Sequence, residues 1–177
     1  MNAKRTLAFM AIIAAFLLLF YSPKIVTSLY LWNASVTDFF ADQAYNLALN
    51  MGAEGLRKDG STFTLQNGEE VIVAFTCVDI VVLAFNTLIP YATFMVVLYL
   101  YEVYMTLPQM IILFLIMLTS SIIANIIRIA TTIYLANNYY DTLVKPVGWI
   151  NFHDSIGLAI MLIHALVWLI IALAIAA

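Results

Sequence analysis

Long runs of apolar residues with very few charges constrain this chain more than any other feature of its sequence. The run from Pro108 to Ile127 contains no Asp, Glu, Lys or Arg. A helix needs about 20 such residues to cross a bilayer. Over 177 residues, 65% are hydrophobic and 10% are charged, whereas about 25% are charged in soluble domains. We therefore expect an integral membrane protein, and the net charge of −3 argues against nucleic-acid binding.

Four apolar runs predict four transmembrane helices in a single, all-α polytopic membrane domain. The predicted spans cover residues 6–22, 78–101, 108–135 and 156–177. Pro90 lies inside the second span, where it removes a backbone hydrogen bond and predicts a kink. A chain of this length has no room for a large soluble domain beside four such spans.

Basic residues before the first run indicate how the chain is oriented. Lys4 and Arg5 favour a cytoplasmic N-terminus. No small-residue cleavage pattern follows the run, so we interpret it as a retained helix rather than a signal peptide. With four spans, residues 24–76 and 136–155 would lie outside and residues 102–107 inside. We therefore expect a multi-pass protein of the plasma membrane.

The polar segment between the first two spans begins with the pattern of a short amphipathic helix. Ser35 and Asp38 resemble a capping box, and Gly52 would end the helix. The apolar residues between them recur at helical spacing: Phe40, Ala44, Leu47, Ala48 and Met51. This pattern predicts an extracytoplasmic helix on the membrane surface.

A β-hairpin is predicted in the rest of this segment, which ends at residue 76. Asn67-Gly68 is a strong signal for a two-residue hairpin turn. The apolar residues on either side alternate as they do in strands: Phe63, Leu65, Val71, Val73 and Phe75.

Three reactive or charged residues fall at the outer ends of three different predicted spans. Cys77, the only cysteine, opens the second span, Arg128 lies late in the third, and His153 immediately precedes the fourth. A thiolate is a nucleophile that a nearby cation or helix N-terminus stabilises, and a histidine exchanges protons near neutral pH. A guanidinium stabilises a thiolate or an oxyanion. Together the three residues predict covalent acyl transfer at the outer membrane face.

Each of these residues also has a non-catalytic interpretation. Cys77 can be a small packing residue, Arg128 can reach the lipid headgroups with its long side chain, and His153 can be an ordinary interfacial residue. A non-catalytic membrane assembly subunit is therefore the first alternative function. The second is a small transporter or proton-relay protein that uses Asp79, Arg128, His153 and His164, but the sequence has no internal repeat.

His164 and Asp79 each keep two interpretations. His164 either relays protons or is a hydrogen-bonded residue of the helix core, and Asp79 either caps a helix or orients a catalytic partner. His153 and His164 have no cluster of cysteine or carboxylate residues close to them that would complete a metal-ligand set. We therefore expect no metal and no other cofactor.

The order and spacing of three motifs resemble those of the exosortase/archaeosortase family of membrane-embedded cysteine transpeptidases. Cys77 opens an apolar helix after a strand-like approach, Asn125 and Arg128 match the family's Asn-x-x-Arg element, and His153 and Gly157 match its His-x-x-x-Gly element. The motifs extend from about Phe75 to His164, half of the chain. The chain departs from the family after the cysteine, where Val78-Asp79 replaces the usual Ser or Thr followed by Gly. Its single predicted span before the cysteine makes it a minimal-length member.

The resemblance implies a substrate and a mechanism. The substrate would be a secreted protein with a C-terminal sorting signal, which combines a recognition motif, a transmembrane helix and a basic tail. Cys77 would attack the peptide bond outside the membrane, Arg128 would stabilise the oxyanion or thiolate, and His153 would protonate the leaving amine. A lipid or envelope nucleophile would resolve the thioester, or water would, which would make the protein a protease.

Four further residues are expected to support this site. Asn125 would orient Arg128 by hydrogen bonding, and Gly157 would permit close packing of the helices. Asp79 and Asp154, which adjoin the candidate cysteine and histidine in sequence, complete the set.

Overall fold

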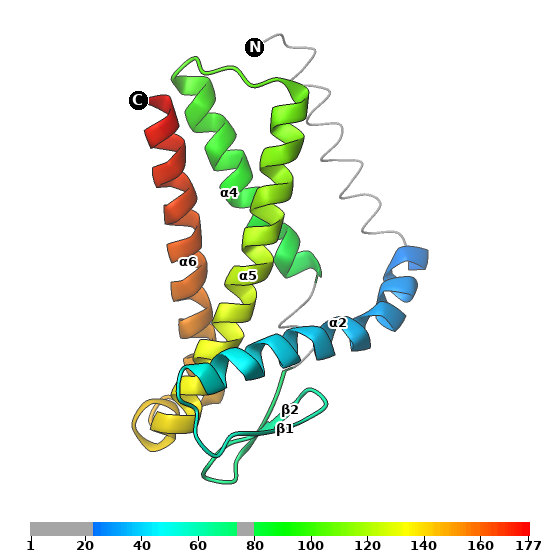
Figure 1. Cartoon of the computed structure of the whole chain (residues 1–177), viewed down its shortest axis with the longest axis vertical. Coiled ribbons are helices and arrows are strands. Elements are labelled where there is room, and N and C mark those ends of the chain that lie inside the picture. The colour runs from blue at the N-terminus through cyan, green and yellow to red at the C-terminus, as the bar shows by residue number, and fades with distance from the viewer. Residues whose placement is uncertain (1–22, 74–79) are drawn as a thin grey trace. The chain divides into compact units, whose positions relative to one another are not determined.

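The computed structural model describes residues 23–73 and 80–177 (Figure 1). Contacts divide the chain into two units, Met1–Val36 and Thr37–Ala177. The predicted first span and the candidate residues Cys77 and Asp79 lie outside the described residues. All other candidate residues belong to the second unit.

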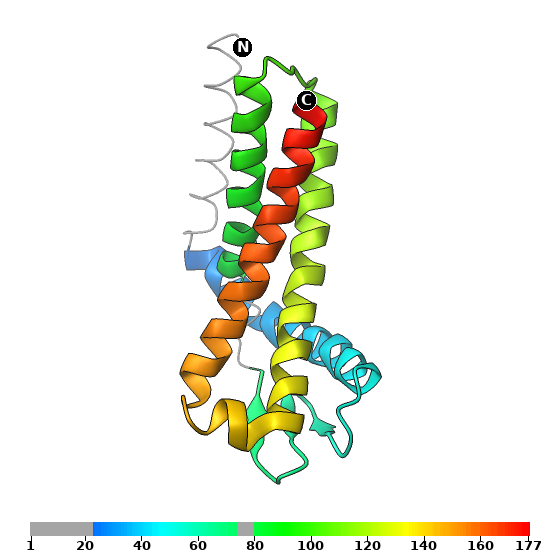
Figure 2. The same ribbon diagram turned by 90° about the vertical axis from the view of Figure 1, so that its left-hand side faces the viewer.

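Three helices pack side by side in the second unit: α4 (Ile80–Leu100), α5 (Leu107–Tyr139) and α6 (Trp149–Ala176) (Figures 1 and 2). Within the described residues, α5, extended by the short π-helix η1 (Tyr140–Val144), and α6 are long and apolar enough to cross a membrane. α4 contributes a shorter apolar stretch, Asn86–Leu100. These three helices overlap the second, third and fourth apolar runs, with different ends.

The first turn of α5 shows why this helix begins where it does. Pro108 occupies a first-turn position, where its missing N–H does not cost a hydrogen bond. The backbone N–H of Thr106 donates to Gln109 Oε1 at 2.8 Å, which satisfies the chain just before the helix. At the other end, α5 continues past the predicted limit of residue 135 to Tyr139.

Burial changes sharply along α5. Its first part exposes large apolar side chains, namely Leu107, Ile111, Ile112, Leu115, Ile116, Ile123 and Ile127. Most of the following residues are buried: Arg128, Ile129, Ala130, Thr132, Ile133, Ala136 and Asn137. At 1.5 Å per residue the helix is about 50 Å long, which exceeds the roughly 30 Å of bilayer hydrocarbon. The exposed part therefore suits lipid, and protein covers the remainder.

α2 (Pro23–Asn50) is longer than the helix predicted in this region. The predicted start at Ser35 is wrong, because the helix begins at Pro23 and no proline or glycine interrupts it before Gly52. From Thr37 onward its buried residues share one face: Thr37, Phe40, Ala41, Ala44 and Ala48. Gly52, at φ 96°, ends the helix in the left-handed conformation that glycine adopts without strain.

A three-stranded antiparallel sheet follows, in the order β1 (Arg57–Asp59), β2 (Thr62–Thr64) and β3 (Glu70–Ile72). Phe63 pairs with Val71 across β2 and β3. The alternating residues of this pair form its buried face: Phe63, Leu65, Val71 and Val73. β1 was not predicted, because Arg57-Lys58-Asp59 has no apolar alternation.

The sheet packs against the C-terminal part of α2. Lys58 Nζ lies 2.6 Å from Asp42 Oδ1, and the ring of Tyr45 lies 6.2 Å from that of Phe63. The Tyr45 hydroxyl also donates to the carbonyl of Leu56 at 3.4 Å. The C-terminal part of α2 thereby supplies the apolar cover that a three-stranded sheet needs for stability.

Pro90 lies inside α4, as the sequence indicated, and a neighbouring helix compensates for it. Proline has no N–H to donate to the carbonyl four residues earlier, which here belongs to Asn86. The hydroxyl of Ser121, on α5, lies 3.1 Å from this carbonyl oxygen and donates to it, sharing its proton with Met117 O. Ser121 is fully buried, so the bond is made at the interface between α4 and α5.

Candidate functional site

Arg128 lies on α5 at the start of the stretch in which most residues are buried. Its side chain is buried, with only 8% of the residue exposed. A Cβ placed on Gly157 would lie 3.5 Å from both Cδ and Nη1 of Arg128. The guanidinium of α5 therefore rests directly against the backbone of α6 at its one glycine. A Cβ at position 157 would make an ordinary van der Waals contact, whereas a longer side chain would occupy the space that the arginine uses.

His153 belongs to α6, whereas the sequence placed it just before the last helix. The helix begins earlier because a helix that projects beyond the bilayer needs no apolar run, so polar residues fit its first turns. His153 Nδ1 lies 3.0 Å from Asp154 Oδ1, and its ring lies 6.2 Å from that of Trp149. The side chain of His153 is 25% exposed, and that of Asp154 is 71% exposed.

The spacing on α6 brings His153 and the Arg128 contact to the same side of the helix. Residues four apart in a helix lie one above the other, so Gly157 follows His153 on one face. Asn125, fully buried, precedes Arg128 on α5 by one turn. The structure thus brings Arg128 and Gly157 into contact, with Asn125 and His153 on the same two helices one turn away.

Cys77 and Asp79 lie outside the described residues, which stop at Val73 and resume at Ile80. Before this gap, the N–H of Val73 donates to the carbonyl of Ser61 at 2.9 Å, which ties this residue to the sheet. After it, α4 begins at Ile80.

Two amide residues that the sequence did not single out join the sheet to α5. Asn137 Oδ1 accepts from the N–H of Gln66 at 2.9 Å, and its Nδ2 donates to the carbonyl of Glu54 at 2.9 Å. Gln66 Nε2 donates to the Asn137 carbonyl at 2.7 Å, and Asn138 Nδ2 donates to the carbonyl of Gly52 at 3.1 Å. The sole sequence signal was the Asn137-Asn138 pair at the end of an apolar run.

His164 lies deeper along α6, in a hydrogen-bonded cluster with α5. Its Nε2 lies 2.9 Å from Ser120 Oγ, and Trp168 Nε1 donates to both, at 3.0 Å to Ser120 and 3.2 Å to His164. Ser120 Oγ also lies 2.8 Å from the carbonyl of Met117. Such bonds link membrane helices to one another.

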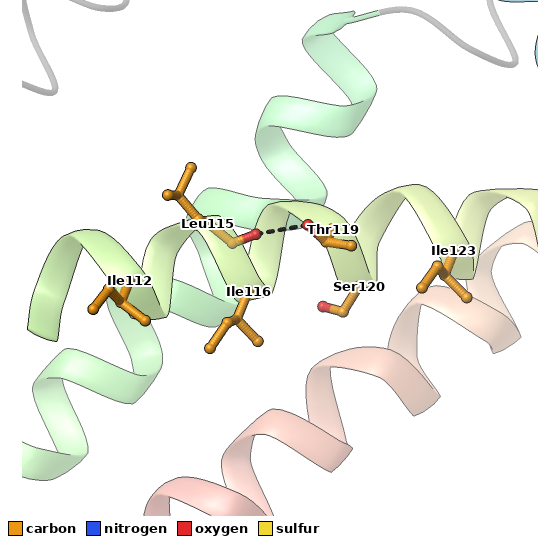
Figure 3. Close-up of a pocket in the computed structure, with 6 residues that line it drawn as sticks. All are labelled: Ile112, Leu115, Ile116, Thr119, Ser120 and Ile123. Atoms are coloured by element: carbon orange, nitrogen blue, oxygen red, sulfur yellow. Dashed lines mark hydrogen bonds between the residues drawn. The ribbon is translucent and has the colours of Figure 1, made fainter.

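A shallow, largely apolar groove of about 430 Å³ runs along α5 beside this cluster (Figure 3). It is lined by Ile112, Leu115, Ile116, Thr119, Ser120 and Ile123. None of the site candidates lines it, so we assign it to the lipid-facing part of the helix. No group of three or more His, Cys, Asp or Glu residues that could hold a metal occurs among residues 23–73 and 80–177.

Comparison with known families decides how the chain is classified. The model of the transmembrane exosortase family matches residues 2–171 of the 177. The chain belongs to this family. The exosortase match extends well beyond the motifs that suggested it and confirms that resemblance. It also shows that the chain is a membrane protein, in keeping with the two apolar helices. No curated protein and no solved structure matches the chain.

Proposed function

We propose that this exosortase is a membrane-embedded cysteine transpeptidase that cleaves the C-terminal sorting signal of secreted proteins. The observation that carries the proposal is the contact between Arg128 and Gly157, which belong to two different family motifs. A buried guanidinium near lipid is costly, so we expect Arg128 to serve a function. Membership of the exosortase family indicates that this function is cysteine transpeptidation.

In the proposed first step, the Cys77 thiolate attacks the carbonyl carbon of the scissile peptide bond. The tetrahedral oxyanion is stabilised by Arg128, which stays charged throughout. His153 then donates a proton to the nitrogen as the C–N bond breaks. The hydrophobic tail leaves as an amine, and the rest of the substrate remains on Cys77 as a thioester.

In the second step, an amine or hydroxyl of a lipid or envelope component attacks the thioester. His153 takes the proton of this nucleophile, and the Cys77 thiolate leaves. Attack by water would yield a free carboxylate and make the enzyme a protease. The Asp154 carboxylate accepts from His153 Nδ1–H, an arrangement that holds the imidazole with Nε2 as its proton-accepting nitrogen.

Helix lengths support an active site at the outer membrane face. Arg128 lies 21 residues after Leu107, which corresponds to about 32 Å along α5. His153 lies 23 residues before Ala176, or about 35 Å along α6. Both distances are close to the roughly 30 Å of hydrocarbon in a bilayer. Because α5 and α6 run in opposite directions, both residues would lie near one interface.

The test is cleavage of a secreted protein with a C-terminal hydrophobic helix and basic tail, co-expressed with the full chain. We expect loss of the tail with the wild type and none with Cys77→Ala. Hydroxylamine should release the trapped thioester as a hydroxamate of the substrate. Intact processing by Cys77→Ala would overturn the proposal and favour a non-catalytic assembly subunit.

A further inference from the structure

The groove along α5 carries hydroxyl groups at a depth where lipid offers no hydrogen bonds. Figure 3 shows four of its residues along one side of the helix: Ile112, Ile116, Ser120 and Ile123. Ser120 lies 13 residues after Leu107, or about 20 Å along a helix that crosses roughly 30 Å of hydrocarbon. Small and hydroxyl residues at such depths are enriched where one membrane helix packs closely against another.

The hydroxyls in the groove retain the capacity to accept hydrogen bonds. A hydroxyl donates one hydrogen bond and accepts two. Trp168 Nε1 donates to Ser120 Oγ at 3.0 Å, and the proton of Ser120 goes to Met117 O or to His164 Nε2. The hydroxyl of Thr119 donates within its own helix. No other described residue donates to either oxygen, so both can accept from a helix that packs into the groove.

The groove leads along α5 towards the proposed active site. Its side chains and the next exposed one share the spacing of a single helical face: Ile116, Ser120, Ile123 and Ile127. Arg128 follows Ile123 by five residues, which is about 8 Å along the helix. A helix in the groove would therefore leave the hydrocarbon near Arg128, where the proposed reaction cleaves its substrate.

The opposite end of the groove lies towards an isolated negative charge. Glu102 is the only charged residue in the sequence between Asp79 and Arg128. It is exposed in the turn that joins α4 to α5 (Figure 1). A basic segment that follows a helix in the groove would emerge at this turn, where the carboxylate attracts it. The order of helix and basic tail in the proposed substrate matches this arrangement.

We propose that this groove of α5 is the docking site for the transmembrane helix of the sorting signal, with the basic tail towards Glu102. The inference rests on the proposed function, which supplies the substrate, and adds where on the enzyme the helix lies. A second copy of the chain and a lipid acyl chain are the competing occupants, and the experiments below distinguish them.

Photo-crosslinking in membranes identifies the occupant. A photoreactive phenylalanine analogue replaces Ile116 in the full chain with Cys77→Ala, and the secreted protein of the cleavage assay is co-expressed. Ile163, on α6, is the matched control position, because it is 61% exposed against 52% for Ile116 and does not line the groove. We expect an adduct with the substrate from position 116 and little from position 163. Adducts mainly with a second copy or with lipid, or equal yields from both positions, would overturn the inference.

Filling the groove should weaken substrate binding without changing the chemistry. Ile116→Trp removes no hydrogen bond, and we expect it to raise KM about tenfold and to leave kcat unchanged. Ile163→Trp should change neither. Glu102→Lys should raise KM about threefold, as for an exposed ion pair, and only for a substrate whose tail is basic. An unchanged KM in folded Ile116→Trp would overturn the inference.

The two proposals can fail separately, because crosslinking needs no turnover. Adducts from position 116 without cleavage by the wild type would refute the proposed reaction and support the docking site. Cleavage by the wild type without such adducts would support the reaction and refute the docking site.

Discussion

At the scale of single residues, the site depends on an arginine held against a helix that has no side chain at the point of contact. Gly157 gives Arg128 room, and the carboxylate of Asp154 holds the ring of His153 at 3.0 Å. Each support comes from a residue one turn or one position from a proposed catalytic group. Substitutions of Gly157 and Asp154 should therefore distinguish an effect on helix packing from an effect on the proposed reaction.

Two substitutions of Gly157 should differ sharply. A Cβ at 3.5 Å from Arg128 is an ordinary van der Waals contact, so Gly157→Ala should leave cleavage close to wild type and gain about 1 kcal/mol of helix propensity. Gly157→Leu must displace the guanidinium, and we expect cleavage to fall about 100-fold, as for loss of an oxyanion donor. Cleavage assays with thermal unfolding as a folding control test this. Equal activity of the two variants would contradict it.

Asp154→Asn should slow cleavage without unfolding the protein. The charged acceptor on His153 Nδ1 is lost, so the imidazole is held less well for proton transfer. Because Asp154 is 71% exposed, we expect a loss of about tenfold, well below the roughly 10⁴-fold loss for a buried triad aspartate. Asp141→Asn, which removes an exposed pair with Lys145, is the control and should retain full activity. An undiminished rate in Asp154→Asn would rule out the orienting role.

At the scale of helices and strands, the sequence was informative where the bilayer sets the pattern and less so elsewhere. Apolar runs marked α5 and α6, because lipid admits little else. The start of α6 was placed too late, since polar residues such as Asn151 and His153 read as a loop although they belong to the helix. Asn137 could not be identified, because its partners are 71 and 83 residues away. Sequence periodicity indicates local burial, but it gives no information on residue pairs so far apart in the chain.

The bond between α5 and the kink of α4 should appear as an energetic coupling between Ser121 and Pro90. Ser121→Ala should cost about 0.6–1 kcal/mol of the free energy of unfolding. In Pro90→Ala, the restored N–H can bond to Asn86 O itself, so the same Ser121 substitution should cost clearly less. Reversible unfolding in mixed micelles measures this double-mutant cycle. Thr119→Ala, whose hydroxyl bonds within α5 to Leu115 O, should cost the same in both backgrounds.

At the scale of the whole molecule, burial along α5 divides a lipid-exposed part from a part covered by protein. Large apolar side chains are exposed repeatedly from Leu107 to Ile127, and most residues from Arg128 to Asn137 are buried. This boundary lies about one hydrocarbon thickness from the start of the helix. The second unit thus joins a bundle of α4, α5 and α6 to the sheet, which is attached to the C-terminal end of α5 through Asn137.

The two ends of α5 should consequently be labelled from opposite sides of the membrane. In a Cys77→Ser background, the variants Tyr104→Cys and Asp141→Cys each carry one thiol at an exposed position, before and after α5. Lys4 and Arg5 favour a cytoplasmic N-terminus, so a chain with the four predicted spans would have position 141 outside and position 104 inside. A membrane-impermeant maleimide should label Asp141→Cys in intact cells and Tyr104→Cys only after permeabilisation. Labelling of both from one side would show that α5 does not cross, and the reverse pattern would place Arg128 and His153 on the cytoplasmic face, where secreted substrates do not arrive.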